Sequence, residues 1–228
     1  MKRLLLFLTA LSLSLAASAQ DDNFIFDMPD DFAQLDTVAR PAQFKSIHMI
    51  GVSYGVNWSG VTSSPGLGQE KKLTFNNVGV YFTYYHALWD QLFNFGLKFG
   101  VTHSYEGYVT PKNNYGETCE LVEIPLISQF KLDFSRFRFL INLGTFGGYR
   151  LSTDKEGGFD KYDQRYDYGV MGGGGLAVVF HPIEIHVEAN YKHALASMYH
   201  SNKISDIYWI YTYPQQIMFS ASLFVHLW

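Results

Sequence analysis

Cysteine, basic charge and long apolar runs are all scarce in this sequence. Cys119 is the single cysteine among 228 residues, which excludes an internal disulfide framework. Lys and Arg number 17 against 21 Asp and Glu, and the resulting net charge of -4 leaves no basic surface for nucleic acid. Beyond the N-terminus, no apolar stretch approaches the ~20 residues that a membrane-spanning helix needs. We interpret Cys119 as a strand residue and not as a nucleophile.

Residues 1–19 predict a secretory signal peptide that is cleaved. Lys2 and Arg3 precede an apolar run, which ends in the small-residue cleavage pattern Ala-Ser-Ala. Residues 20–43 are rich in Asp and lack clear periodicity, so we interpret them as an acidic, flexible periplasmic arm. The remaining residues, 44–228, are expected to form one folded domain, and the protein is expected to leave the cytoplasm.

Aromatic residues and a two-residue alternation dominate this domain. Phe (19) and Tyr (16) are abundant, which favours strands over helices. Phe137, Phe139, Ile141 and Leu143, for example, form one apolar face opposite a face that carries arginine and asparagine. Such alternation recurs in eight segments: 48–58, 78–84, 93–102, 122–133, 137–144, 170–180, 183–192 and 217–228. Each is near the ~9–11 residues with which a tilted strand crosses a bilayer.

The connections between these segments are alternately short and long. The short ones are 88–91, 133–136 and 181–182, and the long, polar ones are Ser59–Lys72, Tyr108–Thr118, Ser152–Tyr166 and Ala196–Gln215. A transmembrane barrel has this pattern, with short turns in the periplasm and long loops outside. The apolar faces carry almost no charge and would overfill the narrow interior of eight strands, so we expect them to face lipid. A soluble barrel, with its apolar face inward, is the alternative.

We therefore predict an all-β fold, an eight-stranded antiparallel up-and-down transmembrane β-barrel with short periplasmic turns and long extracellular loops. Its expected location is the cell outer membrane of a Gram-negative bacterium. Outer-membrane lipid then becomes an expected partner of the apolar faces.

Four stretches of the domain resemble the PorT-like outer-membrane β-barrel proteins of Bacteroidetes. They are LVEIPLISQFKL (121–132), LGTFGGYRL (143–151), DYGVMGGGGLAV (167–178) and IEIHVEANYKHAL (183–195), and they occur in the family's order. The resemblance covers the chain from about Phe44 to Trp228. It implies an outer-membrane location and, for most relatives, an unassigned activity, whereas the namesake takes part in type IX secretion.

A charged face in residues 183–192 raises the question of a metal or catalytic site. Glu184, His186 and Glu188 occupy alternate positions, and carboxylate and imidazole groups are zinc ligands. Successive side chains on one face of a strand are ~6.6 Å apart, however, so these three cannot converge on an ion without other elements. We interpret the face as part of a polar lumen in which opposite charges neutralise one another. The predicted lumen network is Lys98, Glu123, Lys131, Arg138, Arg150, Glu184, His186, Glu188 and Lys192.

Two backbone features are also interpreted as structural. Gly172–Gly175 lack the following helix and Lys-Ser/Thr pair of a phosphate loop, so we expect a bend or the close approach of lumen Tyr or Arg side chains. Pro125 has no N–H for the strand ladder, and we expect a bulge or a local gap in pairing there.

Serine and histidine near the outer rim would be needed for a lipid-modifying enzyme. His103 and Ser104 lie on opposite faces of one strand, and Ser197, His200 and Ser201 lie on the last long loop. No carboxylate stands at a recognisable spacing to orient a histidine. We assign no catalytic residue, no metal site and no cofactor.

Aromatic residues at the strand ends and in the last loop suggest two kinds of surface. We expect Trp58, Trp89 and Trp228 to belong to aromatic girdles at the membrane boundaries. A possible binding surface in the last loop comprises Tyr199, Tyr208, Trp209, Tyr211 and Tyr213. Packing within the loop and anchorage at the outer membrane interface is an equally good interpretation of these five.

The predicted function is that of a non-enzymatic scaffold or binding protein that acts through its loops or arm. This includes an accessory role in type IX protein secretion, with other envelope or secretion-machinery proteins as partners. A small-solute pore is an alternative, disfavoured because side chains normally fill an eight-stranded interior. A lipid A-modifying enzyme is a further alternative.

Overall fold

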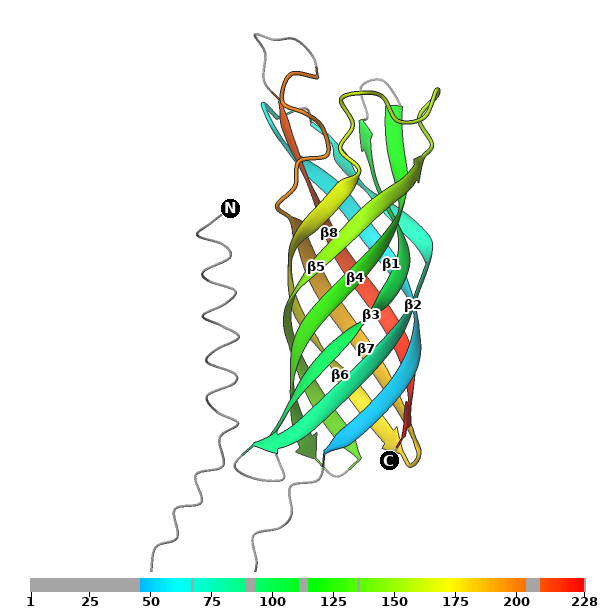
Figure 1. Cartoon of the computed structure of the whole chain (residues 1–228), viewed down its shortest axis with the longest axis vertical. Helices are drawn as coiled ribbons and strands as arrows, with labels where there is room; N and C mark the ends of the chain where they lie inside the picture. The colour runs from blue at the N-terminus through cyan, green and yellow to red at the C-terminus, as the bar shows by residue number, and fades with distance from the viewer. Residues whose placement is uncertain are drawn as a thin grey trace, which may run out of the picture. The chain divides into compact units, whose positions relative to one another are not determined.

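Eight antiparallel strands form a closed barrel in the computed structural model of the chain (Figure 1). The structure describes residues 46–66, 68–88, 93–110, 115–134, 136–203 and 210–227, so the predicted signal peptide and arm lie outside it. The strands are β1 (Ile47–Ser64), β2 (Glu70–Leu88), β3 (Phe93–Thr110), β4 (Tyr115–Phe134), β5 (Phe137–Thr153), β6 (Tyr166–Phe180), β7 (Ile183–Ala194) and β8 (Tyr211–His226). Each strand pairs with its neighbours in sequence, and β1 pairs with β8. The predicted eight-stranded antiparallel fold is confirmed.

The two faces of the barrel wall differ in polarity, because side chains alternate along each strand. On β5, Leu143 is 65% exposed on the outside, whereas the neighbouring Asn142 is 2% exposed on the inside. Every strand contributes exposed Ile, Leu, Val or Phe to the outer surface. A soluble protein rarely exposes a continuous apolar patch larger than roughly a few hundred Å². The outer surface is therefore the lipid-facing side of a membrane barrel, and the polar face lines its lumen.

The strands are longer than predicted, with 12 residues in β7 and 20 in β4. β1 and β2 extend to residues 64 and 70, so the long loop predicted over Ser59–Lys72 is wrong and the connection is 65–69. The loop predicted over Tyr108–Thr118 is wrong for the same reason and is reduced to 111–114. Ser59, for example, is fully buried and donates a hydrogen bond to the Gly107 carbonyl at 3.0 Å. A run of polar residues does not mark the end of a strand that continues beyond the lipid, because water can solvate polar side chains on either face of the barrel wall there.

Two long connections remain, residues 154–165 between β5 and β6 and residues 195–210 between β7 and β8. Their described parts, residues 154–165 and 195–203, lie at the end of the barrel that is uppermost in Figure 1. The opposite end carries the short connections, such as His181–Pro182 between β6 and β7. Short turns belong in the periplasm and long loops outside the cell. In the part of the chain that the structure describes, no helix has the length and apolar character to cross a membrane.

The glycine run in β6 lets the backbone of β7 approach closely. A Cβ at Gly173 would overlap the Ala189 carbonyl oxygen, and a Cβ at Gly175 would overlap that of Val187. The close approach predicted here is confirmed. The expected neighbours, Tyr or Arg side chains of the lumen, are wrong, because strand pairing brings the backbone of β7 there instead.

Pro125 interrupts the ladder on one side only. The pairing of β3 with β4 passes from Phe99–Leu126 directly to Thr102–Glu123, without a change of register. On its other side, Pro125 pairs with Phe146 of β5. The local gap expected from the missing N–H is therefore present.

Candidate functional site

The structure places all nine residues of the predicted lumen network inside the barrel. They are Lys98 on β3, Glu123 and Lys131 on β4, Arg138 and Arg150 on β5, and Glu184, His186, Glu188 and Lys192 on β7. None is more than 8% exposed. The network forms successive groups from the periplasmic to the extracellular end, and each group joins strands that are not neighbours.

Glu188 is the centre of the middle group. Its carboxylate accepts hydrogen bonds from Lys98 Nζ at 2.5 Å, Gln129 Nε2 at 2.8 Å and Asn142 Nδ2 at 2.9 Å. The Lys98 ammonium also lies 4.6 Å from the ring centroid of Tyr81. Protein groups thus replace the water that both charges lose on burial, which is the condition for a buried ion pair to be tolerated.

The next group towards the outside is built around Glu123. Lys192 donates to this carboxylate from the facing side of the barrel, and Ser104 Oγ donates to it at 3.0 Å. The Lys192 ammonium lies 4.5 Å from the centroid of the buried Phe146 ring. Charge and aromatic surface together fill this level of the lumen.

At the periplasmic end, Glu184 is shared by three cationic or potentially cationic groups. Arg138 donates to its carboxylate, His186 Nε2 lies 2.9 Å from Oε1, and His226 Nε2 lies 3.1 Å from Oε2. Glu184 and His186 are therefore joined to each other, while Glu188 belongs to the middle group. Within the described residues, no set of three His, Cys, Asp or Glu side chains is arranged to hold a metal ion.

Apolar side chains complete the filling of the lumen at this end. Met49, Tyr81, Tyr85 and Phe224 form a buried cluster inside the barrel. The Lys131 ammonium lies 4.3 Å from the Tyr85 ring centroid. Alternation places these residues on the inner face, but it does not reveal that Phe224 meets the others, because β8 joins β1 only when the barrel closes.

At the extracellular end, the fully buried Arg150 joins the wall to the loop between β5 and β6. Its Nε donates to Glu106 at 2.6 Å, and Nη2 lies 3.3 Å from Asp167. Its Nη1 donates to the Gln164 carbonyl at 2.9 Å. Glu106 also accepts from Gln216 at 2.9 Å, so four strands and one loop converge here.

Residues 195–203, which we call the cap, turn inward over the extracellular mouth. Met198 and Tyr199 are 3% and 7% exposed and pack against Tyr108 and Cys119. The Tyr199 hydroxyl donates to Glu117 and lies 2.9 Å from the Tyr108 hydroxyl. Burial, together with Tyr108 and Glu117, raises the pKa of Tyr199, so this phenol remains a hydrogen-bond donor.

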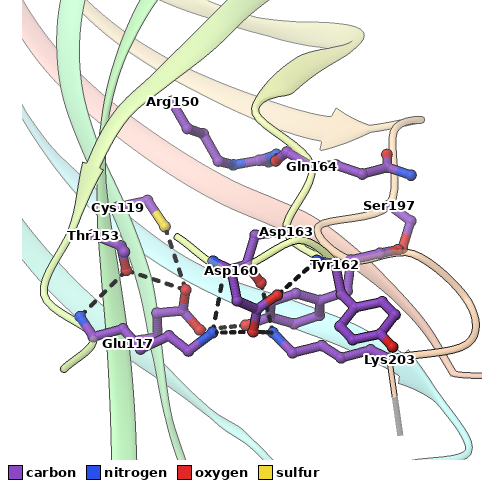
Figure 2. A network of polar contacts seen from close by, with 12 residues as sticks. Glu117, Cys119, Arg150, Thr153, Asp160, Tyr162, Asp163, Gln164, Ser197 and Lys203 are labelled. Carbon is purple, nitrogen blue, oxygen red and sulfur yellow. Dashed lines mark hydrogen bonds and ion pairs between the residues drawn. The ribbon is translucent and has the colours of Figure 1, made fainter. Parts of the chain in front are cut away.

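An ion-pair cage holds the cap against the loop between β5 and β6, as Figure 2 shows. Lys203 of the cap lies 2.6 Å from Asp163, which is also 3.1 Å from Lys155, and Lys155 lies 2.8 Å from Asp160. Burial opposes ionisation of Asp163, but the hydrogen bonds from Lys203, the Asp160 N–H and Lys155 prevail, and its pKa is lowered. Burial likewise opposes the charge on Lys155, but its bonds to Asp160 and Asp163 raise its pKa. The hydrogen bonds of the cage thus favour the charged forms of Asp160, Asp163 and Lys155.

No protein-family model matches the chain, and no curated protein matches it. Solved structures that are similar to it include Neisserial surface protein A (NspA), at 12% identity and a TM-score of 0.42, covering 79% of this chain and 98% of that chain. Another is Ail, the attachment invasion locus protein of Yersinia pestis, in complex with the heparin analogue sucrose octasulfate, at 15% identity, a TM-score of 0.40 and coverage of 78% and 98%. A third is the outer membrane protein AlkL in DMPC lipid bilayers, at 13% identity, a TM-score of 0.38 and coverage of 83% and 95%.

The lipid-facing surface and the charged lumen decide the location of this chain. A closed barrel with an even number of antiparallel strands, apolar outside and polar inside, is the construction of outer-membrane proteins. The protein lies in the cell outer membrane, with its lipid as the surrounding medium. Its mouth and loops remain as the surfaces that other molecules can reach.

The serine and histidine candidates for catalysis do not form a nucleophile–base pair. His103 and Ser104 face opposite sides, as predicted, and His103 Nε2 lies 2.7 Å from Glu120 Oε1 on the outside. No spacing in the sequence indicated this carboxylate, because it is the pairing of β3 with β4 that brings Glu120 to His103. Ser152 Oγ donates to the same carboxylate at 2.6 Å and not to the imidazole. Ser104 and Ser152 thus both donate to carboxylates, and neither donates to His103.

The candidates in the last loop have structural partners. Ser197 Oγ donates to the Tyr199 carbonyl at 2.8 Å and accepts from the Thr212 N–H at 3.2 Å. The backbone N–H of His200 donates to the Tyr162 carbonyl, and the Ser201 carbonyl accepts from the Ile210 N–H. These contacts fix the shape of the cap.

The aromatic residues predicted for the membrane girdle and for the last loop differ in where the structure places them. Trp58 is 45% exposed on the outside, with Lys71 Nζ 4.6 Å from its ring, while Trp89 and Trp228 lie outside the described residues. The binding-surface interpretation is wrong for Tyr199, whose hydroxyl turns inward to buried partners. Tyr211 and Tyr213 are exposed and half-buried, and Tyr208 and Trp209 fall in the undescribed part of the loop. Exposed tyrosines near the outer ends of β5, β6 and β7 are Tyr149, Tyr166, Tyr168 and Tyr191.

Proposed function

We propose that this protein is a non-enzymatic scaffold or binding protein of the outer membrane that acts through its extracellular loops or its N-terminal arm. The observation that carries the proposal is the filled lumen beneath a closed mouth. Buried ion pairs occupy successive levels of the barrel, and Tyr199 bonds to Glu117 above them. Such an interior serves stability and leaves the outer surfaces for recognition.

The extracellular side has the rigidity that a recognition surface needs. The backbone of Asp163 forms an isolated β-bridge with that of Tyr199 in the cap, and the ion-pair cage joins the same two loops. A loop that is already ordered loses less conformational entropy on binding. Exposed positions on it include Glu156, Lys161 and Tyr166.

The finer form of the proposal is an accessory role in type IX protein secretion as a PorT-like protein. It is supported by the four stretches that resemble this family: three fall within β4, β5 and β6, and the fourth covers β7 and Leu195. These stretches build the wall and the lumen. The residues that select a partner would then lie in the loops or in residues 20–43.

Site-specific photo-crosslinking in native membranes tests the proposal. A photoreactive residue at Glu156 or within residues 20–43 should give protein adducts, whereas one at Val187, which is 60% exposed on the lipid side, should give lipid adducts only. Mass spectrometry would identify the proteins. Secretion-machinery components would support the finer form. Protein adducts of any other kind would overturn it, and the absence of protein adducts from both positions would overturn the scaffold proposal itself.

Planar bilayer recordings separate this proposal from a solute pore. The purified full-length barrel should show no steady conductance, because paired side chains block the lumen. A steady open current at neutral pH that is absent from bilayers without the protein would favour the pore.

A further inference from the structure

A cleft of about 380 Å³ lies on the extracellular side, between the two long loops and the outer ends of β5 and β6. Tyr149, Asp163, Gln164, Arg165, Tyr166 and His200 line it. Its volume is within the range of sites for small ligands or headgroups. The backbone carbonyls of Gln164 and Tyr166 accept hydrogen bonds from Arg150 of the lumen network, which fixes this side of the cleft to the barrel wall.

Arg165 gives the cleft its charge. Its guanidinium lies 4.6 Å from the Phe159 ring centroid, and Nη1 donates to the Tyr149 hydroxyl at 3.3 Å. No carboxylate among the described residues forms an ion pair with it. The aromatic ring and the phenol thus hold the side chain in place while its charge stays unneutralised. A planar guanidinium in this state is suited to bidentate binding of phosphate.

The acidic residue of the cleft does not cancel this charge. Asp163 is occupied by Lys155, Lys203 and the backbone N–H of Asp160. Its negative charge is therefore balanced within the cage. The cage sets two lysines against two aspartates, since Asp160 also pairs with Lys155 and Lys203, so Arg165 is the charged group of the cleft that is left for an anion. The exposed His200 adds a further possible donor.

The height of the cleft on the barrel indicates where its ligand comes from. Phe137 begins β5 at the periplasmic turn, and Tyr149 follows twelve residues later. At ~3.3 Å per residue and a tilt of ~45°, this separation is about 28 Å along the barrel axis. The hydrocarbon core is ~30 Å thick, so Tyr149 and Tyr166 lie at the outer boundary and Arg165 just above it.

We propose that this cleft binds a phosphate group carried by the headgroup of a lipid in the outer leaflet, with Arg165 as the phosphate ligand. The two tyrosines would contact the junction between the headgroup and the acyl chains. The proposal depends on the membrane location of the barrel and not on the identity of any protein partner.

Native mass spectrometry of the full-length protein in detergent tests the proposal with lipid A that carries its phosphates. Arg165→Gln should weaken binding of this lipid about tenfold, the loss expected for one charge-assisted, bidentate contact. Tyr149→Phe should weaken it less, since the guanidinium loses only one of its two supports. Arg136→Gln is the matched control, because this exposed arginine lies at the periplasmic turn and should leave binding unchanged.

Two further probes distinguish the sources of the phosphate. Dephosphorylated lipid A with the same acyl chains should bind weakly and equally to the wild type and to Arg165→Gln. Inorganic phosphate alone should not displace the phosphorylated lipid at equal concentration. The proposal is overturned if Arg165→Gln binds phosphorylated lipid A like the wild type, if dephosphorylation does not weaken binding, or if inorganic phosphate competes fully. Before the binding measurements, each variant is shown to be folded by a heat-dependent gel mobility that matches that of the wild type.

Discussion

Replacing Lys98 by methionine should destabilise the barrel by about 3–5 kcal/mol, because it leaves the Glu188 carboxylate buried without its cation. The side chains of Lys98 and Glu188 are 3% and 1% exposed, so water cannot replace the ammonium. Gln129 and Asn142 would still donate to the carboxylate, but neutral amides do not compensate its charge. Methionine has a similar volume to lysine, so a cavity adds little to this loss. The substitution also removes the contact of the Lys98 ammonium with the Tyr81 ring, which adds up to ~2 kcal/mol to the loss in the free energy of unfolding.

A double-mutant cycle separates the ion pair from the other effects of the substitution. Glu188→Gln alone should cost a similar amount, and Lys98→Met with Glu188→Gln should cost at least ~2 kcal/mol less than the two single losses together. The free energy of unfolding would be measured by urea titration in lipid vesicles, followed by tryptophan fluorescence. Lys161→Met, at an exposed loop position, is the control and should change stability by less than ~0.5 kcal/mol. A loss below ~1 kcal/mol for Lys98→Met, or additive single losses, would refute a tightly paired lumen.

Two predictions concern the cap and use Cys119, which is 1% exposed beneath it, as a reporter. Tyr199→Phe removes the hydroxyl that donates to Glu117, a contact of about 1.5–3 kcal/mol. Labelling of Cys119 by a thiol reagent should therefore become about 10–100 times faster in the folded protein. An unchanged labelling rate would show that the phenol does not hold the cap. In the folded protein, burial opposes ionisation of Asp163, but the hydrogen bond from Lys203 and those of the other cage groups prevail and lower its pKa. The stability that the Asp163 carboxylate contributes is therefore complete above its usual pKa of ~3.9, and it is lost as the pH falls through the lower pKa of the folded state. Labelling with a disulfide reagent that reacts in acid should stay slow from neutral pH to about pH 5 and accelerate only below about pH 4, and acceleration already near pH 6 would contradict this assignment.

The position of each side chain inside or outside the barrel could be predicted from the sequence. Leu143 faces lipid and Asn142 faces the lumen because a strand alternates with a period of two and the two solvents differ in polarity. Glycine and proline also acted locally, at Gly173 and at Pro125, where the missing side chain or N–H has a direct consequence in the ladder.

Features that depend on contacts between distant residues could not be predicted in this way. Glu117 and Tyr199 are separated by 82 residues, and their hydrogen bond exists only because the cap turns inward. Glu120 meets His103 through the register of β3 with β4, which no short motif encodes. The extension of β1 to Ser64 was also missed, since polar residues outside the lipid do not distinguish a strand from a loop.

The balance of buried charge explains why the lumen and the cap belong to one structure. The fully buried carboxylates are Glu106, Glu117, Glu123, Asp167, Glu184 and Glu188, and the buried cations are Lys98, Lys131, Arg138, Arg150 and Lys192. Among the described residues, these carboxylates outnumber the buried lysines and arginines by one, and the buried His186 is a further group that can carry positive charge. Glu117 is the carboxylate whose hydrogen bonds come from hydroxyl and thiol groups, with Thr153 donating at 3.1 Å and Tyr199 and Tyr108 from the opposite side. Since a buried carboxyl group is costly unless it is hydrogen-bonded, the inward turn of Tyr199 supplies Glu117 with a hydrogen bond that the wall alone does not, and closing the mouth stabilises the interior as well as the loops.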